Sequence, residues 1–288
     1  MRPLKLAIPN KGRLSEDAVR LLRQAGIHLR GSSDRQLFAS ALDGRLHVLY
    51  LRASDIPTFV ADGTVDCGVT GLDVVRESGH ALDERLDLRF GGCKLVAAVP
   101  DDHAAQSIDE LPDGVRIATS FPNLTRAHFE AAGKKVHITE VSGACEVTPR
   151  LGVADAITDL TSSGSTMLMN HLRPIGTILR STCWLVAAPK VADEVAEELE
   201  RLAFALESVV AAQDKRYLLA DVPRDSLDEV RSFLPGVAGP TVVDIAGDPD
   251  TVAIQVVVDE SEVYAAVHRL QGLGGRGILI VPIDRLVP

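Results

Sequence analysis

Short apolar runs alternate with amphipathic segments through the first two thirds of the chain, and this alternation restricts the possible folds more than any other feature. The run "LKLAI" at 4–8 leads through the polar loop "PNKGR" into "SEDAVRLLRQAG" at 15–26, and the same order recurs five more times. The apolar residues of the first such helix recur at helical spacing: Ala18, Leu21, Leu22 and Ala25. Strands that alternate with helices predict a mostly parallel sheet with helices on both faces.

The ends of the first helix also carry sequence signals. Ser15 is placed to cap its start, and Gly26 is suited to its exit. The loops that follow the strands are polar, and most hold Gly with Ser or Thr. In a parallel sheet such loops gather at one edge, where ligands bind.

The length and composition predict more than one domain. A chain of 288 residues with 46% apolar residues exceeds the size at which a single core keeps growing. The glycine-rich "FGGCKLVAAVP" at 90–100 indicates a crossing into a second α/β lobe, and the long helical segment at 191–213 indicates a return. We therefore expect two lobes with a cleft between them.

The last 70 or so residues have a different pattern, β-α-β-β-α-β, which is the ferredoxin-like order. Such a domain buries one sheet face under two helices and leaves the other face or an edge free for a partner. The expected domains are a first lobe, a second lobe and a C-terminal domain: 1–92 with about 186–213, then 93–185, then 214–288.

The net charge of −10 argues against a protein that coats nucleic acid or an anionic membrane surface. Neither a signal sequence nor an apolar stretch of 18 residues is visible, so we expect a cytoplasmic protein. The cysteines are isolated, without the spacing of a structural zinc site: Cys67, Cys93, Cys145 and Cys183.

The stretch "ADAITDLTSSGST" at 154–166 ends a buried-looking strand in a loop of small, mostly hydroxylated residues. Such a loop offers backbone N–H groups and hydroxyls to a small anion such as a phosphate. It has neither the lysine of a Walker A loop nor the GxGxxG spacing. A plain polar loop that caps a helix remains an alternative. The candidate phosphate ligands are Thr161, Ser162, Ser163, Gly164, Ser165 and Thr166.

Two acids precede this loop on the same strand face. Asp155 and Asp159 are separated by about 13 Å along a strand, so they cannot hold the same small group. Asp159, at the strand end, is better placed to accept hydrogen bonds from the hydroxyls of a sugar whose phosphate lies in the loop. We expect Asp155 to be structural.

Other loops supply cations and acids. Lys11 and Arg13 flank Gly12 and could neutralise a pyrophosphate or triphosphate, although a solvated basic turn is equally compatible. Glu146 and Asp73 could bind Mg²⁺, a ribose or an amine, or could simply cap helices. Arg116 and Arg126 are weaker candidates.

Several segments together carry a recognisable pattern: "IPNKGRLSEDAVRLLRQAGI", "DIPTFVADGTVDCGVTGLDVV", "RIATSFPNLTRAHF" and "GACEVTPRLGVADAITDLTSSGSTM". In these segments the chain resembles one enzyme family, the ATP phosphoribosyltransferases of histidine biosynthesis. The tail resembles the regulatory domain of the long form, so the similarity runs from residue 4 to the end. The loop "DLTSSGST" corresponds to the family's loop for the 5-phosphate of phosphoribosyl pyrophosphate, with Ser163 where the family commonly has Thr.

The resemblance implies a magnesium-dependent transfer of phosphoribosyl to N1 of the adenine of ATP, with release of pyrophosphate. Lys11, Arg13 and Mg²⁺ would neutralise the leaving group. Which acids contact the metal is left open. The implied fold is α/β, with a two-lobed catalytic part like the type II periplasmic binding proteins and a C-terminal ferredoxin-like (ACT-like) regulatory domain.

The C-terminal domain would bind histidine as a feedback inhibitor, and the resemblance assigns this pocket to Asp221, Thr241 and Gly277. The family further implies a homo-oligomer, a dimer that assembles to a hexamer. A domain used only for dimerisation is the alternative.

Two other functions are compatible with the sequence. One is a small-molecule binding or sensing protein on the same two lobes, without catalysis. The other is a catalytically inactive regulatory subunit that keeps only histidine binding.

Overall fold

The computed structural model describes residues 2–30, 37–41, 43–236 and 239–287. The chain divides into two compact units. The first contains the residues up to Arg23 and Ile27–Ala203, and the second contains Gln24–Gly26 and the residues from Phe204 onward. The boundary falls inside one long helix, α6 (Asp193–Ala212), about ten residues before the predicted start of the C-terminal domain.

The first sheet has the strand order β2-β3-β4-β1-β5-β12-β6. Its strands are β1 (Leu4–Pro9), β2 (Leu29–Arg30), β3 (Phe38–Ala41), β4 (Leu46–Leu51), β5 (Cys67–Gly71), β6 (Asp83–Asp87) and β12 (Cys183–Ala187). The central strands β4, β1 and β5 are parallel, with Pro9 opposite Leu51. Helix α2 (Ile56–Ala61) packs on β1 through a small apolar cluster: Ala7, Ile56, Val60 and Val65.

The second sheet has the order β11-β7-β10-β8-β9. Its strands are β7 (Cys93–Pro100), β8 (Val115–Thr119), β9 (Val136–Glu140), β10 (Ala156–Thr161) and β11 (Leu172–Ser181). Alternate residues of β7 enter two separate cores, because successive side chains of a strand point to opposite faces. Ala97 packs on the face that Phe129 of α4 covers, and Val96 packs on the face that Met167 of α5 covers.

Both sheets are mixed, which corrects the expectation of mostly parallel pairing. The parallel strands β4, β1 and β5, and likewise β10, β8 and β9, carry antiparallel neighbours. Strand β12 pairs with β5 and β6, so it belongs to the first lobe. The predicted boundary at 185/186 therefore falls inside β12. The pattern also did not indicate β2, β3 or β6.

Helices cover these sheets where the periodicity placed them, with shifts of a few residues at their ends. Those of the lobes are α1 (Arg13–Gln24), α2 (Ile56–Ala61), α3 (Leu72–Ser78), α4 (Pro122–Ala131) and α5 (Ser165–Met169), with short 3₁₀ turns at Ile108–Glu110 and Cys145–Val147.

Helix α1 begins two residues before Ser15, so Ser15 does not cap it. The carbonyl of Gly12 instead accepts from the amides of Ser15 and Glu16.

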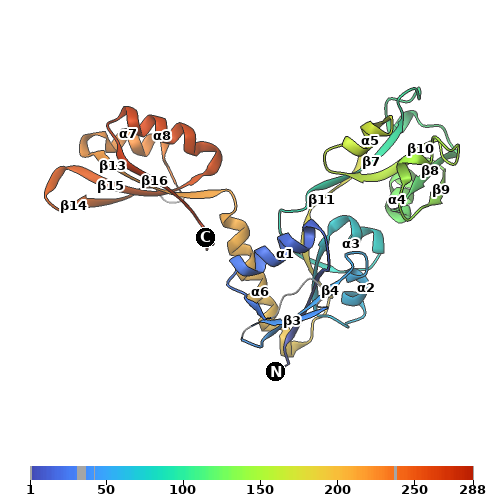
Figure 1. Ribbon diagram of the computed structural model, residues 1–288, viewed down its shortest axis with the longest axis horizontal. Coiled ribbons are helices and arrows are strands. Elements are labelled where there is room, and N and C mark those ends of the chain that lie inside the picture. The colour runs from blue at the N-terminus through green and yellow to red at the C-terminus, as the bar shows by residue number, and fades with distance from the viewer. Residues whose placement is uncertain (1, 31–36, 42, 237–238, 288) are drawn as a thin grey trace. The chain divides into compact units, whose positions relative to one another are not determined.

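The second unit has the predicted ferredoxin-like topology. Its elements are β13 (Lys215–Pro223), α7 (Leu227–Phe233), β14 (Thr241–Ile245), β15 (Asp248–Asp259), α8 (Val263–Gly272) and β16 (Arg276–Pro282), with 3₁₀ turns at Arg224–Ser226 and Glu260–Glu262. The antiparallel sheet has the order β14-β15-β13-β16, and α7 and α8 lie on one of its faces (Figure 1). Its core combines that face of the sheet with Val230 of α7 and Leu270 of α8.

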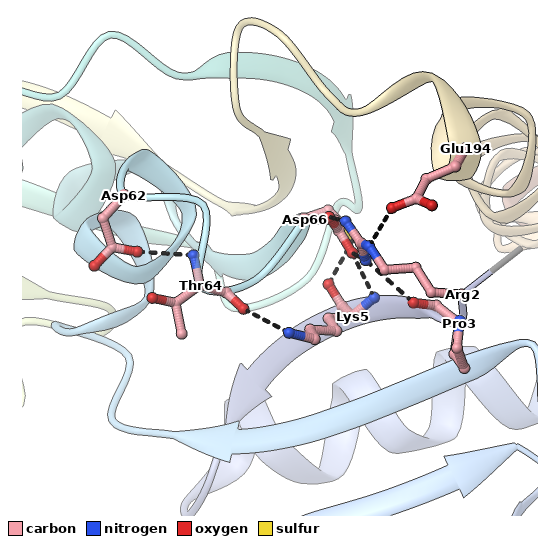
Figure 2. A network of polar contacts seen from close by, with 8 residues as sticks. Arg2, Pro3, Lys5, Asp62, Thr64, Asp66 and Glu194 are labelled. Atoms are coloured by element: carbon pink, nitrogen blue, oxygen red, sulfur yellow. Dashed lines mark hydrogen bonds and ion pairs between the residues drawn. The ribbon is translucent and has the colours of Figure 1, made fainter.

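A polar network fixes the base of the first lobe around one buried carboxylate, that of Asp66 (Figure 2). Its oxygens accept hydrogen bonds from the Arg2 guanidinium at 2.6 and 2.7 Å and from the Lys5 amide at 2.8 Å. Arg2 also reaches Glu194 at the start of α6, at 2.8 Å. Burial acts to raise the pKa of Asp66, but the hydrogen bonds and charges of Arg2 and Lys5 outweigh it, so the pKa is lowered.

We expect Asp66→Asn to destabilise the first lobe by roughly 1–3 kcal/mol, because the negative charge and one of the two acceptor oxygens that bind Arg2 are lost. The difference in the free energy of unfolding between the variant and the unsubstituted protein should be largest above the ordinary aspartate pKa. It should disappear as the pH falls through the lowered pKa of Asp66. Fluorescence of Trp184, the single tryptophan, on β12, reports unfolding of this lobe. Glu194→Gln is the matched control, because it removes an exposed partner of the same Arg2 and should cost less than about 1 kcal/mol.

Candidate functional site

A pocket of about 370 Å³ in the first unit brings together three stretches that are far apart in the sequence. Its lining comes from the loop after β1, the crossing between the lobes and the end of β10: Lys11, Gly12, Arg13, Leu14, Gly91, Gly92, Cys93, Leu160, Thr161 and Ser162. The first lobe thus contributes two cations, and the second lobe contributes the start of the hydroxyl-rich loop.

The cations are placed by the tight turn between β1 and α1. Gly12 has a φ of +76°, in the left-handed region that a residue with a Cβ adopts at a cost, and this turn starts α1 at Arg13. Lys11 and Arg13 are both exposed, and neither shows an ion pair with another described residue. The nearby carboxylate of Asp17 pairs with Arg20 instead, at 2.7 Å. The positive end of the α1 dipole adds to the attraction for an anion.

The loop after β10 is built as the sequence predicts, with small exposed side chains around a left-handed glycine. Gly164 has a φ of +79°, and a Cβ added there would have no atom within 4 Å. Its amide donates to the hydroxyl of Thr161 at 2.8 Å, and the hydroxyls of Ser163 and Ser165 are 2.9 Å apart. Helix α5 has only five residues, so individual amides and hydroxyls, rather than a long helix dipole, would have to hold a phosphate.

Asp159 and Glu146 stand near each other beside this loop. Burial raises the pKa of Asp159 above its ordinary value, a hydrogen bond from the Leu160 amide opposes this rise, and the charge of Glu146 adds to it. Asp159 is half-buried, on the strand that leads into the loop, and Glu146 is half-buried in the 3₁₀ turn Cys145–Val147. Two neighbouring carboxylates of this kind suit the hydroxyls of a sugar or a cation.

The other predicted acid of this strand is structural, as expected. Asp155 accepts two hydrogen bonds from the guanidinium of Arg116, at 2.6 and 3.1 Å, and a third from its amide at 3.1 Å. Arg116 also donates to the carbonyl of Gly152. The second weaker candidate, Arg126, contacts Asn123 on its own helix at 3.3 Å. Both arginines thus have partners within the second lobe.

Asp73 does not line this pocket. It is buried in the first turn of α3, where its carboxylate accepts from the Ser181 hydroxyl at 2.5 Å and its amide donates to the same oxygen at 3.0 Å. Ser181 ends β11, directly before the chain crosses back to the first lobe. The structure therefore places Asp73 at the junction of the lobes, and Asp159 and Glu146 are likewise outside the lining of this pocket.

In the second unit, the structure brings Asp221 and Gly277 together. Gly277 has a φ of +59°, and a Cβ added there would lie 3.2 Å from Asp221 Oδ2. Thr241 is on β14, and β15 lies between it and the strand of Asp221. Two strand spacings across the sheet, about 10 Å, and an offset of two residues along β15, about 7 Å, therefore separate Thr241 from Asp221 within one chain.

Sequence reasoning missed three further cations on the strands that lead to the pocket, although none of them lines it. Arg52 directly follows β4, which runs parallel to β1, so it lies at the sheet edge that carries Lys11. Lys94 is opposite Thr161 in β10 and opposite Arg180 in β11. Arg52, Lys94 and Arg180 are all exposed. Arg52 could have been found from the sequence, because it comes immediately after a predicted strand. The positions of Lys94 and Arg180 depend on antiparallel pairing, which the local pattern does not reveal.

Neither a preformed metal cage nor a membrane-spanning helix is present among the described residues. In the part of the chain that the structure describes, no group of three His, Cys, Asp or Glu side chains is arranged to hold a metal ion. Among the same residues, no helix is both long enough and apolar enough to cross a membrane.

Comparison with known proteins gives a consistent result along the chain. Residues 52–208 match the family model described as ATP phosphoribosyltransferase, and residues 212–285 match the model described as HisG, C-terminal domain. ATP phosphoribosyltransferases from Natronomonas pharaonis and Gemmatimonas aurantiaca are each 48% identical, over 99% of this chain and 100% of theirs. A solved structure, the ATP phosphoribosyl transferase (HisG:HisZ) complex from Thermotoga maritima, is 30% identical with a TM-score of 0.59, over 71% of this chain and 98% of that chain.

Proposed function

The chain belongs to the ATP phosphoribosyltransferase family, enzymes of the first step of histidine biosynthesis, and from this membership we propose how its residues perform the reaction. The phosphoribosyl group passes from phosphoribosyl pyrophosphate to N1 of the adenine of ATP, which yields phosphoribosyl-ATP and pyrophosphate. The observation that supports our assignment is the shared pocket lined by Lys11, Arg13, Thr161 and Ser162.

The reaction breaks the bond between ribose C1 and the pyrophosphate oxygen, and that oxygen keeps the electron pair. Positive charge develops at C1 while negative charge grows on the leaving group. In this proposal Lys11 and Arg13 stabilise the departing anion electrostatically, which is supported by their place in the lining of the pocket. The lone pair of adenine N1 forms the new bond, so the step needs no strong general base.

The donor is held from the second lobe. The 5-phosphate lies in the loop 161–166, and the ribose hydroxyls donate to Asp159 and Glu146. This places C1 between the loop and the cations of the first lobe. Positioning of the donor and ATP in one cleft supplies much of the remaining rate enhancement.

Mg²⁺ is the cofactor in this proposal. Magnesium is usually held by one or two carboxylates together with substrate phosphates and water, so it needs no cage made only of protein ligands. Asp159 and Glu146 fit this pattern, because the charge of Glu146 helps to raise the pKa of Asp159 and a cation would relieve that repulsion. When bound, the ion would neutralise pyrophosphate charge.

Loss of the left-handed glycine in the loop tests the phosphate assignment. In Gly164→Val, a β-branched residue cannot keep a φ of +79° without strain, so the loop shifts and affinity for phosphoribosyl pyrophosphate should fall about tenfold or more. Gly133→Val is a matched control, since Gly133 has a φ of +70° and equally open space but lies outside the pocket. Isothermal titration calorimetry measures the affinity of each variant for phosphoribosyl pyrophosphate. Equal affinities in the two variants would contradict the assignment.

Feedback regulation is the proposed role of the second unit, with histidine bound near Asp221 and Gly277 and with Thr241 contributing from β14, beyond β15 on the same face of the sheet. The carboxylate of Asp221 suits an ammonium or imidazolium group. Equilibrium dialysis with labelled histidine tests this role. If histidine does not bind saturably, the result would favour a domain used only for association between subunits.

We further propose a cytoplasmic homo-oligomer, from a dimer to a hexamer. Strand β16 is an edge strand of the C-terminal sheet, and its Leu279 and Val281 are 59% and 43% exposed. An edge strand with exposed apolar side chains is a natural surface for association. The related Thermotoga maritima protein is described as part of a complex, which is compatible with assembly.

The direct test of the enzymatic proposal is an assay with ATP, phosphoribosyl pyrophosphate, Mg²⁺ and a pyrophosphatase, in which the absorbance of phosphoribosyl-ATP is followed. We expect activity that requires both substrates and is lost with a chelator. Folded protein that forms no product but binds an amino acid in the cleft would instead favour the small-molecule binding protein.

A further inference from the structure

The two lobes of the first unit are joined by two crossings of the chain that lie side by side. One crossing is the segment between β6 and β7, and the other is Thr182, between β11 and β12. The Cys183 amide donates to the Phe90 carbonyl at 2.9 Å, and the Thr182 hydroxyl donates to Asp87 at 2.7 Å. Two adjacent crossings define an axis about which the lobes can rotate.

Three hydrogen bonds that Glu77 accepts join the lobes at a point outside these crossings. Glu77 is on α3 of the first lobe, and its two carboxylate oxygens accept from the amides of Asn123 and Leu124 on α4 of the second lobe, each at 2.9 Å. The Asn123 side chain donates to the Glu77 carbonyl, also at 2.9 Å. Glu77 follows Asp73 by one helical turn, about 6 Å along α3, so this contact is displaced from the crossing where Asp73 binds Ser181.

Helix α4 lacks a cap of its own. The residue at its N-cap is Phe121, which forms no side-chain cap hydrogen bond, and Pro122 has no N–H. The first free amides of the helix are therefore those of Asn123 and Leu124, and the Glu77 carboxylate binds both of them. An acid at this end also interacts favourably with the helix dipole. A carboxylate of one lobe thus supplies the N-terminal cap of a helix in the other.

The capped turn is connected to the site through buried hydroxyls. The Thr125 hydroxyl donates to the Phe121 carbonyl at 2.7 Å and lies 2.6 Å from the hydroxyl of Thr158. Thr158 immediately precedes Asp159 on β10, and Thr125 and Thr158 are both completely buried. Movement of the first turn of α4 therefore acts on the strand that carries Asp159 and the loop.

We propose that Glu77 is a positioning residue that, by capping α4 from the other lobe, fixes the lobe arrangement in which Lys11 and Arg13 face the loop 161–166. This inference rests on the proposed function of that pocket. It goes beyond that function because Glu77 touches no substrate and acts through the rotation of the lobes about their crossings.

The test compares Glu77→Ala and Glu77→Gln with Glu84→Gln. Glu84, on β6, forms an ion pair at 2.9 Å with Arg76, which is on α3 like Glu77. Its substitution therefore removes a carboxylate near α3 without removing a contact to α4. Nitroxide labels at Ala61→Cys on α2 and Ala131→Cys on α4, both exposed, report the distance between the lobes in the full-length protein. Half-buried Cys93 is replaced by Ser in all labelled samples, while the other cysteines are buried.

We expect Glu77→Ala to broaden the distance distribution and to lower kcat by about tenfold or more, because the two halves of the site lose their alignment. The Kd for phosphoribosyl pyrophosphate, bound mainly by the second lobe, should change less than about threefold. Glu77→Gln keeps one acceptor oxygen and should recover part of kcat, and Glu84→Gln should behave like the unsubstituted protein.

An unchanged distance distribution in Glu77→Ala would overturn the proposal. So would a loss of kcat that Glu84→Gln shares, or a lower melting temperature with normal kcat. If the unsubstituted protein shows no transferase activity, the proposed function fails, and the distance comparison alone still decides whether Glu77 fixes the lobes.

Discussion

Arg13→Met should lower kcat/KM for phosphoribosyl transfer by about 10²–10³-fold, and the double variant with Lys11→Met should lower it further. Both cations line the pocket, and neither shows an ion pair with a described residue, so their charges are available to the leaving pyrophosphate. The loss should appear mainly in kcat, because the charge they stabilise is largest in the transition state.

Arg23→Met is the control for this result. Arg23 is also exposed and also lies on α1, in its last turn, but it does not line the pocket. We expect it to leave kcat/KM unchanged. Stability should change by less than about 0.5 kcal/mol in Arg13→Met and Arg23→Met, because both side chains are on the surface. Normal turnover in Arg13→Met would show that the leaving group departs elsewhere.

Asp159→Asn should weaken binding of phosphoribosyl pyrophosphate by about 10-fold to 100-fold and, at neutral pH, should raise the melting temperature. The ribose loses a charged acceptor, while the folded protein loses a carboxylate that burial and Glu146 make costly to ionise. Asparagine has nearly the same shape, and its oxygen can still accept the hydrogen bond from the Leu160 amide. Opposite effects on affinity and stability distinguish a binding residue from a structural one.

The pH dependence of this stability gain follows from the raised pKa of Asp159. A carboxyl group with a raised pKa favours the folded state below its ordinary pKa of 3.8, and this contribution is lost as the pH rises through the raised value. The gain in stability from Asp159→Asn should therefore be largest above the raised pKa and should shrink as the pH falls toward 3.8. Calorimetric melting of both proteins across this pH range measures the gain. A variant less stable than the unsubstituted protein at every pH would contradict the assigned environment of Asp159.

The local pattern of the sequence was sufficient for most of the fold because most elements are specified by short-range signals. The run "LHVLYL" coincides with β4, and the apolar face of the first helix, including Leu21 and Leu22, is buried. The C-terminal domain followed from its order of elements alone. These features depend on periodicity and turn residues within a few positions.

Prediction was limited where a residue's environment depends on a distant partner. Asp73 was assigned either to a ligand or to a helix cap, and its buried contact with Ser181, 108 positions away at the junction of the lobes, left no local signal. Strand β12 was divided between the lobes because its pairing with β5 is antiparallel and nonlocal. Glu77 gave no signal at all, since it caps a helix that begins 45 residues later. Local propensity carries no information about such contacts.

The hydroxyls and amides of the loop 161–166 form hydrogen bonds with one another. A ligand that binds there therefore replaces existing hydrogen bonds and does not simply add new ones. The Gly164 amide is already satisfied by Thr161, and Ser163 is already paired with Ser165. A phosphate that takes these donors displaces neutral contacts worth about 1 kcal/mol each, and its advantage over them is its charge. The loop should therefore discriminate sharply between a dianionic phosphate and an uncharged isostere, and should persist in its folded shape between turnovers.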